Sequence, residues 1–195
     1  MEKYNSHRHF IIYKPYGYLS QFYSNSTQQK KKKFLGLLYD FPNDSMAIGR
    51  LDEKSEGLLL ITTDGKTSDF VNSKKVDKEY YAQVDGDISN EAIQNLKAGV
   101  EIGFEGKKYL TKPCVVSKLN GVPDFPNRSK KIRDDRHGPT SWISITLNEG
   151  KFRQVRKMTS AVGYSTLRLV RVRVGHIQLE SMGIGDVVEV ANLDF

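Results

Sequence analysis

The sequence predicts an α+β fold, with a mixed, largely antiparallel sheet flanked by helices and loops. Apolar runs of strand length recur along the chain, as at 10–13, 58–61 and 141–147. Helix-like stretches separate some of these runs without a regular strand–helix–strand alternation, which disfavours a parallel sheet. The 195 residues suffice for one sizeable domain or for two small ones that share a core.

The first third of the chain contains three predicted strands, at 10–13, 46–48 and 58–61. Between the first two, the polar stretch 24–33 ends in four consecutive lysines. Such a run is typical of a solvated loop, and the alternative is an electrostatic contact to phosphate. The apolar stretch 34–41 then predicts a short helix before Pro42.

Helices and strands are both predicted in the remainder. We expect helices at 66–71, at 89–96 with Ser89 as N-cap, and within 150–163. We expect strands at 78–84, 141–147 and 167–174, a hairpin of 100–104 with 108–116, and a last turn and strand within 179–190. Residues 119–140 form a long irregular stretch with a basic cluster at 128–136, which suggests a functional or flexible loop.

Composition limits the classes of function. The net charge of +7 favours an acidic partner, and nucleic acid is the first candidate. The single cysteine, Cys114, excludes an internal disulfide, fits a reducing compartment and reads as a small core residue. The four histidines show no metal-ligand spacing, so we expect no metal. The chain has neither a membrane-spanning apolar run nor a signal-peptide core, which predicts a cytoplasmic protein without membrane contact.

A basic stretch at 151–175 holds seven Lys or Arg residues and no acid. A helix and a strand of this stretch both carry cations on one side, which favours phosphate binding over an ordinary solvated face. Aromatic residues near the basic regions favour RNA over duplex DNA, although each of them singly is a candidate core residue.

Asp52 lies where one apolar strand ends and a charged turn leads to the next. One interpretation is a turn-capping residue that pairs with Arg50. The other is a catalytic carboxylate on a rigid support, kept ionised by an arginine that can bond it with two N–H groups. Arg156 is the candidate for that partner, because it lies on the basic side of its predicted helix.

The residues around Asp52 belong to an ordered set of motifs. The set comprises Gly49-Arg50-Leu51-Asp52, Gly57-Leu58-Leu59-Leu60 and Thr63-Asp64-Gly65, flanked by Lys14-Pro15-x-Gly17, Lys78-Glu79-Tyr80, the stretch 149–158, Leu169-x-Arg171 and Gly175. It resembles the signature of the RsuA-type ribosomal RNA pseudouridine synthases, and the match covers nearly the whole chain from about Phe10. Each motif alone is weak, but their order and spacing are highly specific.

The resemblance implies isomerisation of uridine to pseudouridine in ribosomal RNA, without a cofactor because the rearrangement is redox-neutral. By analogy, the catalytic residues are Asp52, the essential carboxylate, Tyr80, which lines the pocket, stacks on the base and takes or relays a proton, and Arg156, which pairs with Asp52. Arg50 acts on the RNA, Leu169 packs on the base, and the remaining expected RNA contacts are Lys151, Arg153 and Arg171.

Two details refine the expectation. Only a short polar lead, 1–8, precedes the expected catalytic domain, 9–195, so we expect no separate N-terminal RNA-binding domain. The stretches 19–22 and 139–142 resemble the subgroup called large-subunit type E, which lacks that domain. The expected partner is therefore 23S ribosomal RNA or a large-subunit assembly intermediate, acted on by a monomer. A different ribosomal RNA site, or a non-catalytic RNA-binding or ribosome-assembly protein, is the alternative.

Overall fold

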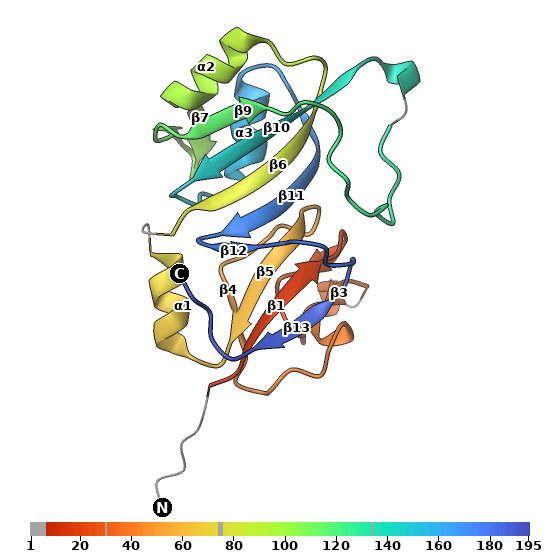
Figure 1. Cartoon of the computed structure of the whole chain (residues 1–195), viewed down its shortest axis with the longest axis vertical. Coiled ribbons are helices and arrows are strands. Elements are labelled where there is room, and N and C mark those ends of the chain that lie inside the picture. Colours follow the sequence, from red (N-terminus) through yellow and green to blue (C-terminus); the bar gives the residue numbers. More distant parts are fainter. Residues whose placement is uncertain (1–6, 30, 74–75, 134) are drawn as a thin grey trace, which may run out of the picture. The chain divides into compact units, whose positions relative to one another are not determined.

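The chain folds into two units, both of which contain antiparallel strand pairs (Figure 1). The structure is a computed structural model that describes residues 7–29, 31–73, 76–133 and 135–195. Unit 1 is formed by Met1–Val76 and Val174–Phe195, and unit 2 by Asp77–Arg173. Among the described residues, no helix combines the length and the apolar character required to cross a membrane.

The paired strands of unit 1 include β1 (His9–Lys14), β4 (Met46–Ile48), β5 (Glu56–Thr62) and β13 (Val187–Val190). β1 pairs with β13 on one side and β5 on the other, β4 pairs with β5, and all three pairings are antiparallel. Every residue of β5 is buried, as are the side chains of Phe10 and Ile12 on β1. These two strands therefore carry the core of the unit, and the predicted strands at 10–13, 46–48 and 58–61 are confirmed.

Unit 1 also contains a helix after β5 and a two-residue strand before β13. The helix α1 (Gly65–Asn72) packs against β4 and begins at Asp64, whose carboxylate accepts the backbone N–H groups of Lys66 and Thr67. A hydrogen bond from the Thr67 hydroxyl, followed by these two backbone hydrogen bonds, holds the pKa of Asp64 below its usual range. The two-residue strand β12 (Ile177–Gln178) lies near the C-terminus.

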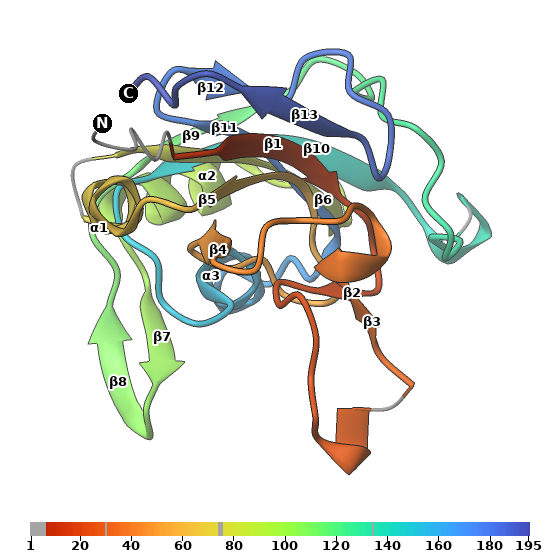
Figure 2. The same cartoon turned by 90° about the horizontal axis from the view of Figure 1, so that it is seen from below.

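The segment between β1 and β4 contains little regular structure and lies beside the sheet of unit 1, in orange in Figure 2. Its two short strands, β2 (Tyr18–Leu19) and β3 (Lys33–Phe34), pair in parallel. Single 3-10 turns occupy Thr27–Gln29 and Leu35–Leu37. Of the predicted lysine run, Lys30 lies outside the described residues.

The predicted helix at 34–41 is wrong, since only the Leu35–Leu37 turn is helical. The N–H groups of Leu35 and Gly36 bond the carbonyl oxygens of Gln21 and Phe22 across the segment, at 2.8 and 3.3 Å. Tyr39 and Phe41 then turn their rings onto Phe10, with centroids 5.5 and 5.3 Å away. Tertiary packing of aromatic rings therefore replaces helix formation here.

The strands of unit 2 lie in the order β11 (Thr166–Val174), β6 (Lys78–Asp85), β10 (Thr140–Leu147) and β9 (Val115–Lys118). β10 is antiparallel to both of its neighbours. Two helices, α2 (Asn90–Ala98) and α3 (Gln154–Ala161), pack on one face and bury Leu96 and Met158 against Ile145. Ser89 caps α2 as predicted, by accepting the Ala92 N–H at 3.1 Å. The α+β, largely antiparallel fold predicted from the sequence is confirmed.

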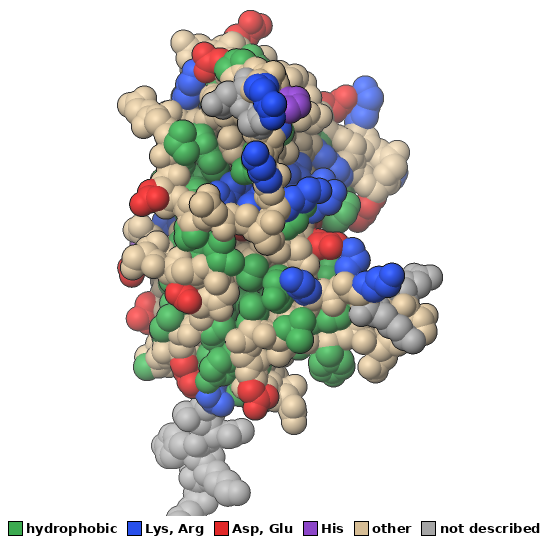
Figure 3. Space-filling view, turned by 90° about the vertical axis from the view of Figure 1, so that its right-hand side faces the viewer, with side chains coloured by type: hydrophobic (Ala, Val, Ile, Leu, Met, Phe, Trp, Pro, Cys, Tyr) green, Lys and Arg blue, Asp and Glu red, His purple; other side chains and the backbone are tan. Residues whose placement is uncertain are grey.

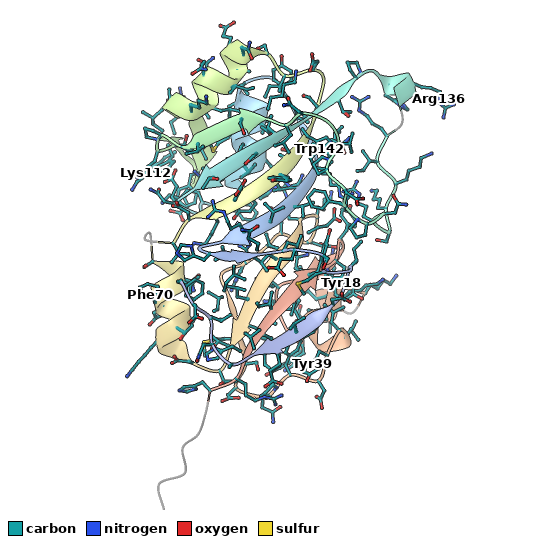
Figure 4. All side chains as sticks on the ribbon, in the orientation of Figure 1. Tyr18, Tyr39, Phe70, Lys112, Arg136 and Trp142 are labelled. Atoms are coloured by element: carbon teal, nitrogen blue, oxygen red, sulfur yellow. The ribbon has the colours of Figure 1, made fainter. Side chains whose placement is uncertain are left out.

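The irregular stretch 119–140 is anchored on the opposite face of this sheet. The Phe125 ring packs against Tyr81 and Trp142, with centroids 6.0 and 5.8 Å away, and the Arg168 guanidinium lies over it. Arg136 lies near the outer end of the stretch (Figure 4), and Lys and Arg side chains gather over this part of the surface (Figure 3). The stretch is thus a loop that is anchored on the sheet and carries Lys and Arg side chains at its surface.

The predicted hairpin forms, but its second strand is shorter than expected. β7 (Glu101–Phe104) pairs with β8 (Lys107–Leu110), and Figure 2 shows them extending away from the sheet. Pro113 has no N–H for a ladder, and Cys114 donates its N–H to Lys97 O instead. The Cys114 thiol donates to Leu96 O, and burial raises its pKa to about 11, in line with a core residue. The chain resumes as β9 beside β10, so 108–116 is two strands.

Glu149 joins three parts of unit 2. Its carboxylate, with the residue only 7% exposed, accepts the Tyr109 hydroxyl at 2.6 Å, the Lys112 N–H at 3.0 Å and the Gln154 amide at 2.6 Å. Burial by itself would raise the pKa of Glu149, but the hydrogen bonds outweigh burial and hold the pKa below the usual glutamate range. The charged form is therefore the one that the fold stabilises.

We expect the Glu149→Gln variant to be less stable by about 2 kcal/mol or more near pH 7, since hydrogen bonds to charged groups are worth about 1.5–3 kcal/mol each. A lowered folded-state pKa gives stability that is complete above the unfolded-state pKa and lost as pH falls through the folded-state pKa. Denaturant unfolding between neutral and acidic pH should show this acid-dependent loss in the parent and a smaller loss in the variant.

The matched control is Glu101→Gln, because the exposed Glu101 pairs with exposed Lys108 on the same hairpin. Its effect should stay below about 1 kcal/mol. Equal stability of parent and Glu149→Gln at neutral pH would contradict the role assigned to this carboxylate.

Candidate active site

Asp52 lies in unit 1, in the loop that joins β4 to β5. The bend begins at Gly49, whose φ of +69° favours glycine. Arg50 is exposed, Leu51 is 5% exposed and anchors the loop in the core, and Asp52 is half-buried. The loop therefore presents Arg50 and Asp52 from a fixed base.

Ser20 holds this loop by a two-way hydrogen bond. Its hydroxyl donates to Leu51 O at 2.8 Å and accepts the Leu51 N–H at 3.0 Å. On the other side of Asp52, Gly17 N–H donates to Glu53 O at 2.7 Å, and Ser55 N–H donates to Asp52 O at 2.9 Å. The backbone on both sides of Asp52 is thus fixed by contacts from Gly17 and Ser20, which precede β4, and from Ser55 within the loop itself.

Lys14 fixes the turn that brings Gly17 to the Asp52 loop. Its side chain is completely buried, and its Nζ donates to Pro15 O at 2.9 Å and to Tyr18 O at 2.7 Å. A buried ammonium needs such acceptors, so these two carbonyls must stay turned toward it. The turn that results places Gly17, at φ +85°, where its N–H meets Glu53. The Lys14-Pro15-x-Gly17 motif is therefore a support of the Asp52 loop.

Tyr80 and Leu169 lie in unit 2 and belong to the same packed face of its sheet. Leu169 is part of the buried core, and the half-buried Tyr80 packs against that core. Strand alternation places Lys78 on the face of Tyr80, and Arg171 on the face of Leu169. Burial first, and then the nearby Arg171 charge, lower the pKa of Lys78. Tyr81 points to the opposite face, where its ring packs against Phe125.

Three of the expected RNA-contacting or ion-pairing residues lie on or just before α3. Arg156 donates to Thr166 O at 3.3 Å, within unit 2. Arg153 precedes the helix, at φ +54°, instead of lying within it. The Lys151 ammonium lies over the rings of Phe104 and Tyr109, 4.8 and 4.9 Å from their centroids. These cations thus frame the junction of α3 with the β7–β8 hairpin.

The expectation of an open basic surface along 151–175 is wrong at two positions. Arg168 is buried and donates to Pro126 O at 2.9 Å, and Arg171 is only 2% exposed. Arg173 is paired with Glu79, an acid outside the stretch, at 2.9 Å. Absence of acids along the sequence therefore does not mean an exposed cationic face, because strand β11 is buried at its centre.

The structure divides the predicted site residues between the two units. Asp52 and Arg50 belong to unit 1, whereas unit 2 carries Tyr80, Lys151, Arg153, Arg156, Leu169 and Arg171. Among the described residues, no group of three or more His, Cys, Asp or Glu side chains is arranged to hold a metal ion.

The family model for RNA pseudouridylate synthases matches residues 8–161. The chain belongs to that family. The enzyme class predicted from the motifs, a pseudouridine-forming isomerase, is therefore confirmed.

Relatives in several bacteria cover most of this pseudouridine synthase. The ribosomal large subunit pseudouridine synthase E of Xanthomonas axonopodis pv. citri is 39% identical over 174 residues, which are 88% of each chain. The enzyme of the same description from Vibrio parahaemolyticus is 35% identical over 92% of this chain and 72% of its own. A solved structure described as a pseudouridylate synthase covers 94% of this chain and 70% of its own, with a TM-score of 0.72 at 24% identity, and supports the fold.

Sequence reasoning assigned no role to three residues of this synthase that lie near predicted site residues of their own unit. Lys14 and Lys78 stood only as parts of motifs, and Ser20 as part of a subgroup resemblance. A lysine inside an otherwise apolar strand, as in His9–Lys14, was the available signal for burial. The signal for Ser20 was weaker, because a serine beside a distant loop has no periodic pattern.

We expect Ser20→Ala to lower the kcat of pseudouridine formation by about tenfold, since the two hydrogen bonds to Leu51 that hold the Asp52 loop are lost. Single-turnover kinetics should show this drop, with a smaller change in RNA affinity. Ser20→Thr keeps the hydroxyl and should restore part of the rate. Ser24→Ala, which removes a hydroxyl bonded to the nearby Ser26 N–H, is the control. A parent-like kcat for Ser20→Ala would refute the positioning role.

Proposed function

We propose that this protein isomerises one specific uridine to pseudouridine in 23S ribosomal RNA, as free RNA or within a large-subunit assembly intermediate. The relatives named large subunit pseudouridine synthase E, which match over most of both chains, support the choice of RNA. The single observation that supports a catalytic loop is the fixed backbone around Asp52, held by Ser20 on one side and Gly17 on the other.

Asp52 is the proposed catalytic carboxylate. In the reaction the C1′–N1 bond of uridine breaks, the uracil rotates, a C1′–C5 bond forms, N1 gains a proton and C5 loses one. Three routes fit a single carboxylate: attack on the ribose C1′, addition to the base, or assistance to a glycal intermediate. All three need a carboxylate that is ionised and aimed, so they share the same structural requirement. No cofactor is required for this redox-neutral rearrangement.

The site residues of unit 2 are proposed to bind the uracil base and to keep Asp52 ionised. Tyr80 and Leu169, which share a packed face, would stack on and pack against the flipped uracil. Arg156 is proposed as the ion-pair partner that keeps Asp52 ionised, because a guanidinium stays charged and offers two N–H groups. This pairing rests on the motif resemblance and on charge, and it assigns Arg50 to the RNA.

RNA affinity is proposed to come from cations on two surfaces. Lys151 and Arg153 lie at the start of α3, whereas Arg171, the third expected RNA contact on unit 2, is only 2% exposed and is not one of these surface cations. The anchored loop 119–140 adds exposed cations such as Lys130 and Arg136. Flipping a uridine costs a few kcal/mol, which phosphate contacts can offset. The protein is proposed to act as a monomer in the cytoplasm.

Tritium release from ribosomal RNA labelled at C5 of uridine tests the proposed chemistry. We expect Asp52→Asn to reduce release by on the order of a thousandfold or more, since the amide cannot replace the carboxylate in acid–base or nucleophilic steps. The exposed Asp44, in the same unit, gives the control Asp44→Asn. Parent-like release from Asp52→Asn would make the catalytic assignment wrong. A parent protein that binds RNA without releasing tritium would favour the non-catalytic alternative.

The target can be mapped by comparing pseudouridines in ribosomal RNA from the parent strain and from a strain lacking this gene. We expect one large-subunit position to lose its pseudouridine, and re-expression of the parent, but not of Asp52→Asn, to restore it. Loss at a small-subunit position alone would contradict the proposed 23S target.

A further inference from the structure

A cavity of about 570 Å³ lies in unit 1 and is not used by the proposed chemistry. Its volume falls in the range of about 300–1,000 Å³ that is usual for small-ligand sites. We call it the aromatic pocket, and its walls come from residues 20–23, 36, 39–43, 45–47 and 49–50. All of its walls therefore belong to residues 20–50, which follow β1 and end within the Asp52 loop.

Aromatic rings form much of the lining. The Phe41 ring lies 5.3 Å from that of Phe22 and 5.1 Å from that of Tyr39, centroid to centroid. Tyr23 also lines the pocket and is 77% exposed, and Tyr39, labelled in Figure 4, is exposed as well. Exposed rings beside a cavity are stacking surfaces of the kind on which unpaired bases bind.

The wall is preformed by a close approach of two backbone segments. Gly36 N–H bonds Phe22 O at 3.3 Å, and a Cβ at position 36 would lie 2.7 Å from that oxygen. Glycine is therefore needed for the segment that carries Tyr39 and Phe41 to lie against the segment that carries Phe22 and Tyr23. A preformed wall lowers the entropic cost of holding a ligand.

The polar groups of the pocket favour a base over a phosphate as its occupant. Asp40 lines the pocket and is exposed, so its charge would repel a phosphate inside. A carboxylate accepts hydrogen bonds only, and the exocyclic amino groups of guanine, adenine and cytosine donate them. The exposed Arg50, at another part of the lining, suits the backbone phosphate of the same nucleotide.

The pocket adjoins the Asp52 loop through shared residues. Ser20 and Arg50 line the pocket, Ser20 also binds both backbone groups of Leu51, and Arg50 precedes Asp52 by two positions. We propose that the aromatic pocket binds an unpaired, amino-bearing base of the substrate RNA that lies next to the target uridine. This inference rests on the proposed function, and it adds a second base-recognition site.

Two exposed lining residues test the pocket without disturbing the core: Tyr23→Ala removes a stacking surface, and Asp40→Asn removes the acceptor-only carboxylate. The control is Leu37→Ala, since Leu37 lies in the same segment, is 68% exposed and is not part of the lining. The substrate is large-subunit ribosomal RNA from the deletion strain, and tritium release gives KM and kcat. Stacking is worth about 1–3 kcal/mol per base, so Tyr23→Ala should raise KM at least about fivefold at unchanged kcat.

Ultraviolet crosslinking of the same RNA to the parent protein, with mass-spectrometric mapping, gives an independent readout. We expect crosslinks at Tyr23 or Tyr39 to a nucleotide adjacent to the target, and their loss in Tyr23→Ala and Asp40→Asn but not in Leu37→Ala. KM values within twofold of the parent for both variants, together with no crosslink in the pocket, would overturn the inference. That result leaves the parent activity intact, whereas a parent that releases no tritium would overturn the proposed function itself.

Discussion

The buried ammonium group of Lys14 is the constraint on which the Asp52 loop depends. A cation without access to water must be surrounded by acceptors, and Pro15 O and Tyr18 O turn inward to supply two. That turn brings Gly17 to Glu53 and leads directly to Ser20, which holds Leu51. The buried charge of Lys14, at the end of β1, therefore determines how the backbone on both sides of Asp52 is held.

Unit 2 uses the opposite charge in a similar way. The Glu149 carboxylate, with three donors around it, ties the β7–β8 hairpin and the chain after it to the start of α3. Lys157 adds a second tie by donating to Gly103 O at 2.7 Å. The arrangement fixes α3 against the face that carries Tyr80 and Leu169. In both units, an ionised side chain inside the fold orients main-chain and hydroxyl groups, and the proposed site residues are attached to those supports.

The elements that the sequence predicted correctly are those specified by local patterns. Apolar runs and caps identified β1, β5, β10 and α2, because burial and N-capping leave a signal within a few residues. The stretch 34–41 was wrongly predicted as a helix because its Leu35 and Gly36 N–H groups bond to carbonyl oxygens of residues 21 and 22, which lie outside the stretch. The burial of Arg168 and Arg171 was not predicted, because the sequence of a charged residue looks the same whether its strand is exposed or buried. Ordered motifs indicated Asp52 and Tyr80, whereas Ser20 and Lys14 act through contacts that only the fold reveals.

The way the Asp52 loop is held has a consequence for how such an enzyme can diversify. Its supports come from Lys14, Gly17 and Ser20, at or before the start of the aromatic pocket, and from β4, whose residues Met46 and Ala47 also line that pocket. The contact between Leu35 and Gln21 closes the intervening chain upon itself. Changes within 24–29 can therefore accumulate with little strain on the Asp52 loop, whereas Lys32 pairs with Glu53 of that loop at 2.8 Å. A lineage can therefore vary this surface segment while the loop that carries Asp52 keeps its supports.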